Sequence, residues 1–145
     1  MREALKEAEK AFRKDEVPVG AVIVAGNRII ARAFNLTETL NDVTAHAEMQ
    51  AITAAASFLG GKYLKECTLY VTLEPCIMCA GALYWAQITR IVYGATDIKR
   101  GYTQLPIMCV GSGKGSLLHP TTSVTSGILE TECAAILSKF FKKKR

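Results

Sequence analysis

Two cysteines stand three residues apart in the stretch Leu73-Glu74-Pro75-Cys76-Ile77-Met78-Cys79-Ala80-Gly81. Strand-forming residues occupy 68–73 and an apolar, helix-like segment follows the cysteines, which together predict strand, turn and helix. Pro75 is expected in the first helical turn, where a missing N–H costs no hydrogen bond. Thiols at positions i and i+3 share one helix face, and the helix N-terminus favours their thiolate forms. Two adjacent thiolates need a cation, and zinc is the usual one in proteins.

The third ligand is expected from one of the two histidines of the chain. His46 lies in Thr44-Ala45-His46-Ala47-Glu48, at the front of a second helical pattern. The other, His119, is expected to be a surface or loop-packing residue. The combination of His-x-Glu with Pro-Cys-x-x-Cys is typical of zinc nucleobase deaminases. The sequence therefore predicts a zinc centre built from His46, Cys76 and Cys79.

Three protein ligands are the number typical of a catalytic zinc site, which keeps one position for water. Zinc lowers the pKa of bound water to about 7, so this water is activated at neutral pH. We expect Glu48 to take a proton from the water and to pass it to the ring nitrogen and the leaving amine. Positions i and i+2 diverge in a regular helix, so His46 is expected at the helix start, where the first residue can turn inward.

Each fragment alone has a plainer interpretation. Cys-x-x-Cys also marks structural zinc knuckles and redox pairs, and an isolated His-x-Glu carries little information. Cys67 and Cys133 are expected to be small core residues rather than ligands. Cys109 falls in a loop, with no partner implied. The prediction of a catalytic site therefore depends on both fragments together, each opening a helix in an α/β pattern.

Length and composition predict a single soluble domain, residues 1–145. No run of eighteen apolar residues occurs, so no membrane span is expected, and residues 1–7 lack the apolar core of a signal peptide. The odd number of cysteines, together with Cys-x-x-Cys, favours a reducing compartment, and we expect a cytoplasmic protein. The net charge of +5 permits a polyanionic partner without requiring one.

Alternating helical and strand patterns fill the rest of the chain. Strands are expected at 19–25, 28–34, 68–73, 89–94 and 121–125, and helices at 2–14, 46–59, 80–86 and 128–141. Gly26-Asn27 marks a hairpin turn, and the glycine-rich segment 101–120 is expected to be a long loop with a short helical turn near Leu117. Residues 142–145 are expected to be a basic, solvated tail. This order predicts a mixed five-stranded sheet between helical layers.

The chain resembles the bacterial tRNA-specific adenosine deaminases (TadA type) of the cytidine deaminase-like superfamily over nearly its whole length. The matching segments are residues 16–22, Asn35, residues 44–48, 68–81, 92–99 and 132–141. The resemblance implies a three-layer α-β-α cytidine deaminase-like fold and a homodimer. It also implies hydrolytic deamination of adenosine to inosine at the wobble position of a tRNA anticodon. Segment 102–114 departs from the pattern, because family members run quickly from Asp-x-Lys into Gly-Ser-Leu.

The resemblance implies a role for each matching site residue. It implies one Zn²⁺ per subunit held by His46, Cys76 and Cys79, with Glu48 as the catalytic proton shuttle. The base pocket is implied at Asn35, Val17 and Ala47, and contacts with flanking nucleotides at Asp97, Phe140 and Phe141. The implied partner is the tRNA anticodon stem-loop. The helix that ends near Tyr84-Trp85 is implied to lie near the subunit interface.

Two other functions fit the same motifs. A zinc-dependent deaminase of a free nucleobase or nucleoside, of the guanine or cytosine type, shares the zinc site. A zinc-stabilised binding module without catalysis shares only the ligands. Asn35, the Phe140-Phe141 pair, the basic tail and the net charge favour RNA over a free base. None of these features indicates which tRNA is used.

Overall fold

The computed structural model describes residues 1–104 and 117–145 of the chain, and a sheet forms its centre. The strands are β1 (Gly20–Ala25), β2 (Arg28–Phe34), β3 (Cys67–Leu73), β4 (Arg90–Ala95) and β5 (Ser123–Thr125). Within these described residues they form one five-stranded sheet in the order β2-β1-β3-β4-β5. β1 pairs antiparallel with β2 and β3, whereas β3 with β4 and β4 with β5 are parallel. The predicted mixed five-stranded sheet is confirmed.

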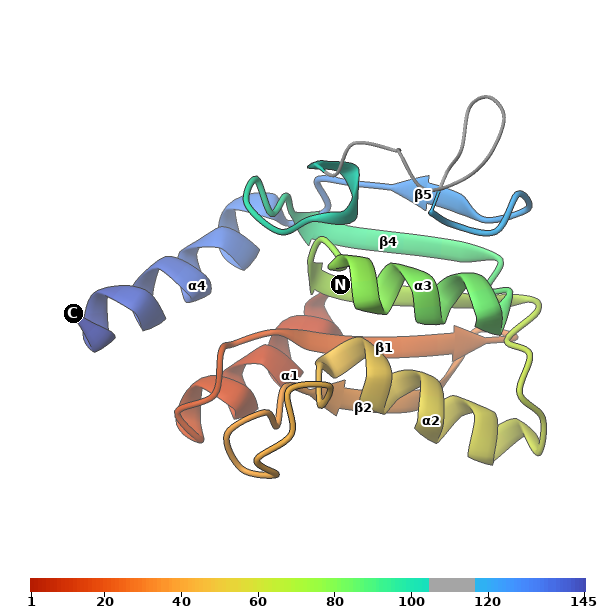
Figure 1. The fold of residues 1–145 in the computed structure, drawn as a ribbon, viewed down its shortest axis with the longest axis horizontal. Coiled ribbons are helices and arrows are strands. Elements are labelled where there is room, and N and C mark those ends of the chain that lie inside the picture. The colour runs from red at the N-terminus through yellow and green to blue at the C-terminus, as the bar shows by residue number, and fades with distance from the viewer. Residues whose placement is uncertain (105–116) are drawn as a thin grey trace.

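Helices cover both faces of this sheet (Figure 1). The longer helices are α1 (Arg2–Arg13), α2 (Ala47–Leu59), α3 (Ile77–Ala86) and α4 (Glu130–Lys144). α2 and α3 lie side by side on one face, whereas α1 and the start of α4 pack on the other. None of these helices in the described part of the chain has the length and apolar character needed to cross a membrane. The predicted three-layer α-β-α arrangement is therefore confirmed.

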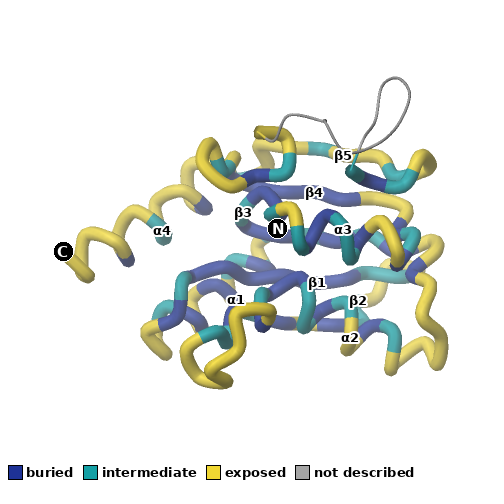
Figure 2. Tube along the Cα trace, viewed as in Figure 1, coloured by how far each residue is buried: buried dark blue, intermediate teal, exposed yellow. Residues whose placement is uncertain are grey.

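The central strands are buried on both faces, which is typical of strands with a continuous apolar run such as residues 19–25. Figure 2 shows β1, β3 and β4 buried along most of their length. Ile23, Leu69 and Ile91 stand in register on neighbouring strands and are fully buried in the main core. Because both layers of helices pack on these strands, the sheet is a rigid support for the loops at its edges.

The β1–β2 hairpin turns at Gly26-Asn27, as predicted. Both residues have positive φ, 52° for Gly26 and 61° for Asn27. These angles are typical of the type I′ turn, whose twist matches that of the flanking strands and which glycine and asparagine adopt most easily. The predicted boundaries of the two strands agree with the structure to within one residue.

The basic segment 142–145 is exposed to solvent, as expected, but it is not an irregular tail. The helix α4 continues to Lys144, and lysines at a helix C-terminus interact favourably with its dipole. Lys144 and Lys143 both pair with the Asp15 carboxylate, the latter at 3.5 Å. Leu117 itself lies in a bend, and the residues before it, where the expected helical turn would also fall, lie outside the described residues. A 3-10 turn forms at Tyr102–Gln104. Residues 105–116, with Cys109, lie outside the described residues.

Candidate active site

The residues of the predicted zinc centre meet at one edge of the sheet. β3 and β4 are parallel and both end at this edge, while β1, which is antiparallel to β3, begins there. The helices α2 and α3 begin at the same edge, next to each other (Figure 1). Ligand sites of α/β proteins commonly lie at the carboxyl ends of parallel strands. His46 and Cys76, each just before a helix, are therefore brought together from distant parts of the chain.

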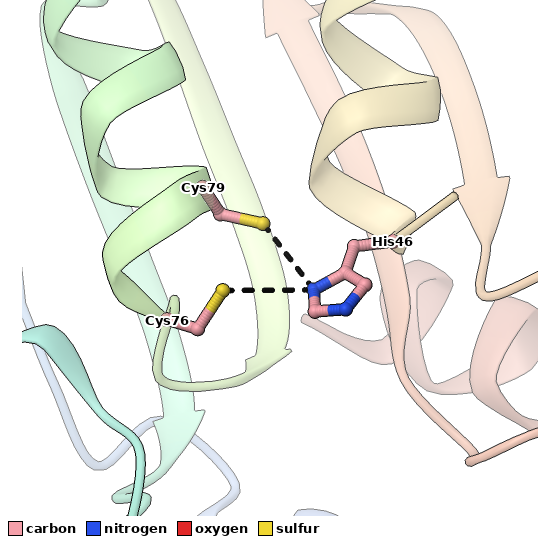
Figure 3. A group of neighbouring side chains, drawn as sticks. All are labelled: His46, Cys76 and Cys79. Atoms are coloured by element: carbon pink, nitrogen blue, oxygen red, sulfur yellow. Dashed lines mark hydrogen bonds between the residues drawn. The ribbon is translucent and has the colours of Figure 1, made fainter. Parts of the chain in front are cut away.

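Figure 3 shows the imidazole of His46 facing both cysteine sulfurs. Its Nδ1 lies 3.6 Å from Sγ of Cys76 and 3.5 Å from Sγ of Cys79. A tetrahedral zinc, with Zn–S bonds of about 2.3 Å and Zn–N bonds of about 2.0–2.1 Å, places nitrogen and sulfur about 3.5–3.6 Å apart. The three residues therefore fit zinc in spacing and in donor type, with Nδ1 as the nitrogen donor.

The backbone at both helix starts explains why these side chains converge. His46 precedes α2 with φ −70° and ψ 155°, and Cys76 precedes α3 with φ −75° and ψ 174°. An extended residue before a helix directs its side chain differently from the residues in the first turn. His46 thus turns inward at the helix start, as expected. The placement of Pro75 in the first helical turn was wrong, since it lies one residue before Cys76.

The pKa values of the two thiols are shifted in opposite directions. A hydrogen bond from Cys79, together with His46, lowers the pKa of the Cys76 thiol to about 4. The same contact with Cys76, together with burial, raises the pKa of Cys79 far above its usual range. Two neighbouring thiolates repel each other, and a divalent cation bound between them compensates both charges. The donor set is therefore suited to a metal ion rather than to two independent thiols.

Glu48 lies beside this cluster, in the first turn of α2. Its side chain is 3 % exposed, and its carboxyl group interacts with the Cys79 thiol. Burial raises the pKa of Glu48 to about 7. The structure thus places a buried carboxyl group next to the three candidate ligands, where the sequence predicted the proton shuttle.

Asn35 joins the end of β2 to the start of α2. Its Oδ1 accepts a hydrogen bond of 2.8 Å from the backbone N–H of Ala47, and its own N–H donates to the carbonyl of Val19. Asn35 and Ala47 are both buried, while Val17 is half-buried at the start of the same sheet edge. The predicted pocket residues therefore lie at the same edge of the sheet as the zinc centre.

The three residues predicted to contact flanking nucleotides differ in how accessible their side chains are. Oδ1 of Asp97 accepts hydrogen bonds of 3.0 Å from the N–H groups of Lys99 and Arg100. The carboxylate therefore stabilises the backbone turn that begins at Asp97. Phe140 is buried edge-on against Phe12 of α1, with ring centroids 6.0 Å apart. Phe141 is 49 % exposed. Of the Phe pair, Phe141 therefore has the ring that is accessible to a partner.

The remaining residues singled out from the sequence lie away from the cluster. His119 packs against the Tyr84 ring and shares a hydrogen bond of 2.8 Å with Thr121. Cys67 and Cys133 are buried, as predicted for core residues. Trp85, at the end of α3, is 77 % exposed, which a core residue would not be.

Two buried carboxylates that the sequence analysis did not single out hold the loops around the site. Glu16 accepts hydrogen bonds from the N–H groups of Thr39, at 2.7 Å, and Glu38, at 3.1 Å. Burial opposes ionisation of Glu16, but these bonds outweigh it and lower its pKa. Glu74 binds the segment 97–103 in the same way. No local sequence signal marks these two residues, because acidic side chains are usually exposed and their hydrogen-bond donors lie far along the chain.

Such a fold, with a His and a Cys-x-x-Cys pair converging on a buried Glu, defines the class of zinc-dependent deaminases. The family model described as the cytidine and deoxycytidylate deaminase zinc-binding region matches residues 1–95. The chain belongs to this family, and zinc is its cofactor.

Two curated relatives match this chain over its full length. The tRNA-specific adenosine deaminase of Agrobacterium fabrum is 47% identical, covering 100% of this chain and 93% of the relative. That of Bacillus subtilis is also 47% identical, covering 100% and 88%. A solved structure from work on A-to-I editing by tRNA deaminases at the wobble position has a TM-score of 0.85 and 47% identity, covering 94% of this chain and 97% of its own. A solved guanine deaminase of Bacillus subtilis has a TM-score of 0.63 and 40% identity, covering 71% and 63%.

Replacing Cys79 tests the metal centre. The substitution Cys79→Ser removes one of the three ligand atoms, so zinc content is expected to fall from about one ion per chain toward zero after dialysis. Metal content is measured by plasma mass spectrometry. Cys67→Ser is the matched control, because Cys67 is also buried but lies outside the cluster, and it should keep its zinc. Full zinc retention in Cys79→Ser would contradict the assignment.

Proposed function

We propose that this protein deaminates adenosine to inosine at the wobble position of a tRNA anticodon by zinc-dependent hydrolysis. The observation that carries the proposal is the placement of Glu48 beside a three-residue zinc site, in a chain that aligns over its whole length with tRNA-specific adenosine deaminases. A three-ligand set that leaves one coordination position open is the arrangement of catalytic zinc sites. This supports an enzyme over a zinc-stabilised binding module.

The chemistry divides between the metal and Glu48. Zinc supplies Lewis acidity, which lowers the pKa of a water molecule to about 7. Glu48 accepts the proton that the attacking water loses as its oxygen bonds to C6 of the adenine ring. The same carboxyl group passes this proton to the ring nitrogen N1. It then takes the remaining proton of the hydroxyl group added at C6 and passes it to the amine, so that the C6–N bond breaks, ammonia leaves and inosine remains. His46, Cys76 and Cys79 hold the metal throughout.

The base pocket is proposed at the ends of β2 and α2. Asn35 is oriented by its bond to the Ala47 N–H, which fixes the amide plane before substrate arrives. A side chain held in this way recognises the edge of a flipped-out base without losing further rotamer freedom. Val17 and Ala47 contribute apolar walls.

The flanking nucleotides are proposed to lie over the segment after β4 and along α4. Asp97 lies in the former, and Phe140 and Phe141 lie in the latter, where Phe141 has the exposed ring. Unstacked bases of an anticodon loop are commonly held by aromatic rings. Lys139, Lys142 and Lys143 on α4 are exposed and suit contacts with phosphates. The proposed partner is therefore the anticodon stem-loop of a tRNA.

The protein is proposed to act as a homodimer in the cytoplasm, with residues 1–145 as one deaminase domain. The C-terminal ends of α2 and α3 support the dimer. They carry exposed Phe58 and Trp85, with Leu59 and Tyr84 beside them. Large exposed apolar side chains on two helices that contact each other support an interaction surface at these helix ends.

A second candidate function is hydrolytic deamination of a free purine base. The likeness to a guanine deaminase at 40% identity favours it. Both reactions use the same zinc and glutamate chemistry, so the metal centre does not separate them. The full-length agreement with tRNA-specific deaminases and the cationic, partly aromatic α4 favour the RNA substrate.

Substrate class is tested by parallel deamination assays. An anticodon stem-loop with adenosine at the wobble position should yield inosine, whereas free adenine, guanine and cytosine should yield little ammonia. A stem-loop with adenosine at a neighbouring loop position is the matched control and should react poorly. Ammonia from guanine with no inosine in RNA would overturn the RNA function and support the second candidate.

Glu48→Gln tests the proton shuttle. The amide keeps the shape of the side chain but cannot exchange the proton, so kcat should fall by about 10²–10⁴-fold while zinc content is unchanged. Glu7→Gln is the control, since Glu7 is also buried but pairs with Lys10 on α1, and it should keep wild-type kcat. Unaltered kcat in zinc-loaded Glu48→Gln would refute the role.

The dimer is tested by Trp85→Glu. A charge at this exposed apolar site should prevent association, so light scattering should give the mass of one chain instead of two. Ile98→Glu is the matched control, because Ile98 is equally exposed, at 77 %, but lies in the segment after β4. A monomeric wild-type protein would contradict the proposal.

A further inference from the structure

Glu74 connects the turn before α3 to the segment that follows β4. Its carboxylate is 2 % exposed and lies two residues before Cys76. Oε2 accepts a hydrogen bond of 3.0 Å from the N–H of Asp97. Oε1 accepts two bonds from Thr103, 3.0 Å from its N–H and 2.6 Å from its hydroxyl. One carboxylate therefore binds both ends of the segment 97–103.

Backbone contacts join the same two parts of the chain. The N–H of Glu74 donates to the carbonyl of Ala95 at 2.8 Å, and the N–H of Tyr102 donates to the carbonyl of Pro75 at 2.9 Å. Cys76 and Gly101 form an isolated antiparallel bridge. The segment therefore runs along the turn that carries a zinc ligand.

Gly101 fits closely against the carboxylate. A Cβ atom at this position would collide with the carboxyl carbon and oxygens of Glu74, so the packing depends on the absence of a side chain. Buried carboxylates are costly unless their lone pairs are used, and here three donors use them. The arrangement is therefore a specific polar contact rather than an incidental one.

Three of the residues between the two anchors face solvent. Ile98, Lys99 and Arg100 are exposed, and the N–H groups of the last two are bound by the Asp97 carboxylate. The loop thus presents two cations at its tip while its ends stay closed on Glu74. Cationic side chains on a backbone that is anchored beside the zinc-binding turn suit the phosphates beside the target base.

We propose that Glu74 is a positioning residue for RNA, which holds segment 97–103 against the turn bearing Cys76. This inference rests on the proposed function, because it assigns Glu74 a part in binding the nucleotides that flank the wobble adenosine. Glu74 itself touches neither substrate nor metal. It acts through Asp97, Lys99 and Arg100, because it determines their position relative to the zinc site.

The substitution Glu74→Gln tests the inference in the zinc-loaded protein. A glutamine retains one acceptor oxygen but turns an NH₂ toward one of the bound donors, so one anchor is lost. Amide hydrogen exchange of the segment 97–103 should become about tenfold faster. KM for the anticodon stem-loop should rise about tenfold, with kcat changed much less and zinc content unchanged.

The loop held by Glu16 supplies the matched comparison. In Glu74→Gln, exchange at residues 37–39 should stay at the wild-type rate, because the backbone N–H groups of Glu38 and Thr39 bind to Glu16. Glu16→Gln should show the reverse pattern. Acceleration of both segments in both variants would mean general destabilisation and would overturn the specific role.

Gly101→Ala provides a second way to release the segment 97–103 from the Glu74 carboxylate. Its Cβ displaces the Glu74 carboxylate, so KM should rise as in Glu74→Gln. In a Glu74→Ala background there is no carboxylate to displace, so adding Gly101→Ala should change KM little further. Additive effects of the two substitutions would overturn the proposal.

Two further outcomes are decisive. If Glu74→Gln loses zinc, and kcat falls while KM is unchanged, then Glu74 supports the metal turn only and the inference fails. If the wild-type protein does not deaminate the stem-loop at all, the proposed function fails. In that case the exchange rates at 97–103 still show whether Glu74 holds the segment.

Discussion

Charge compensation at two neighbouring thiolates is the constraint on which the rest of the structure depends. A cation shared by Cys76 and Cys79 needs a third donor, and Nδ1 of His46 has to reach both sulfurs from another helix. The starts of α2 and α3 must therefore lie side by side, on one face and at one edge of the sheet. The antiparallel β1–β3 pairing and the parallel β3–β4 pairing together produce that edge.

Buried polar side chains hold the loops around this centre. Asn35, Glu16 and Glu74 each accept hydrogen bonds from backbone N–H groups far along the chain. Loops have free N–H groups that a sheet or helix would otherwise bind, and a buried acceptor satisfies them while fixing their path. Hydrogen bonds to buried side chains thus hold these segments in place, which suits a site that must hold a substrate in one orientation.

One metal centre serves several substrates in this family, so specificity has to come from the surrounding segments. The likeness to a guanine deaminase and to tRNA deaminases shows the same fold with different named activities. In this chain the segment after β4 and the helix α4 carry exposed cations, and α4 also carries one exposed aromatic ring. Ionic and stacking contacts of this kind add affinity for a nucleic acid, whereas a free base offers no phosphates to bind.

The local sequence alone specified the strands, the hairpin turn and the candidate ligands His46, Cys76 and Cys79, because periodicity and spacing are local properties. It also indicated Glu48 through its distance from His46. Tertiary structure decided the rest. The partners of Glu74 lie 23 and 29 residues away, so nothing nearby in the sequence revealed its role. Phe140 is buried and Phe141 exposed because Phe12 of α1 covers one ring and not the other, and only the packing of α4 on α1 determines which.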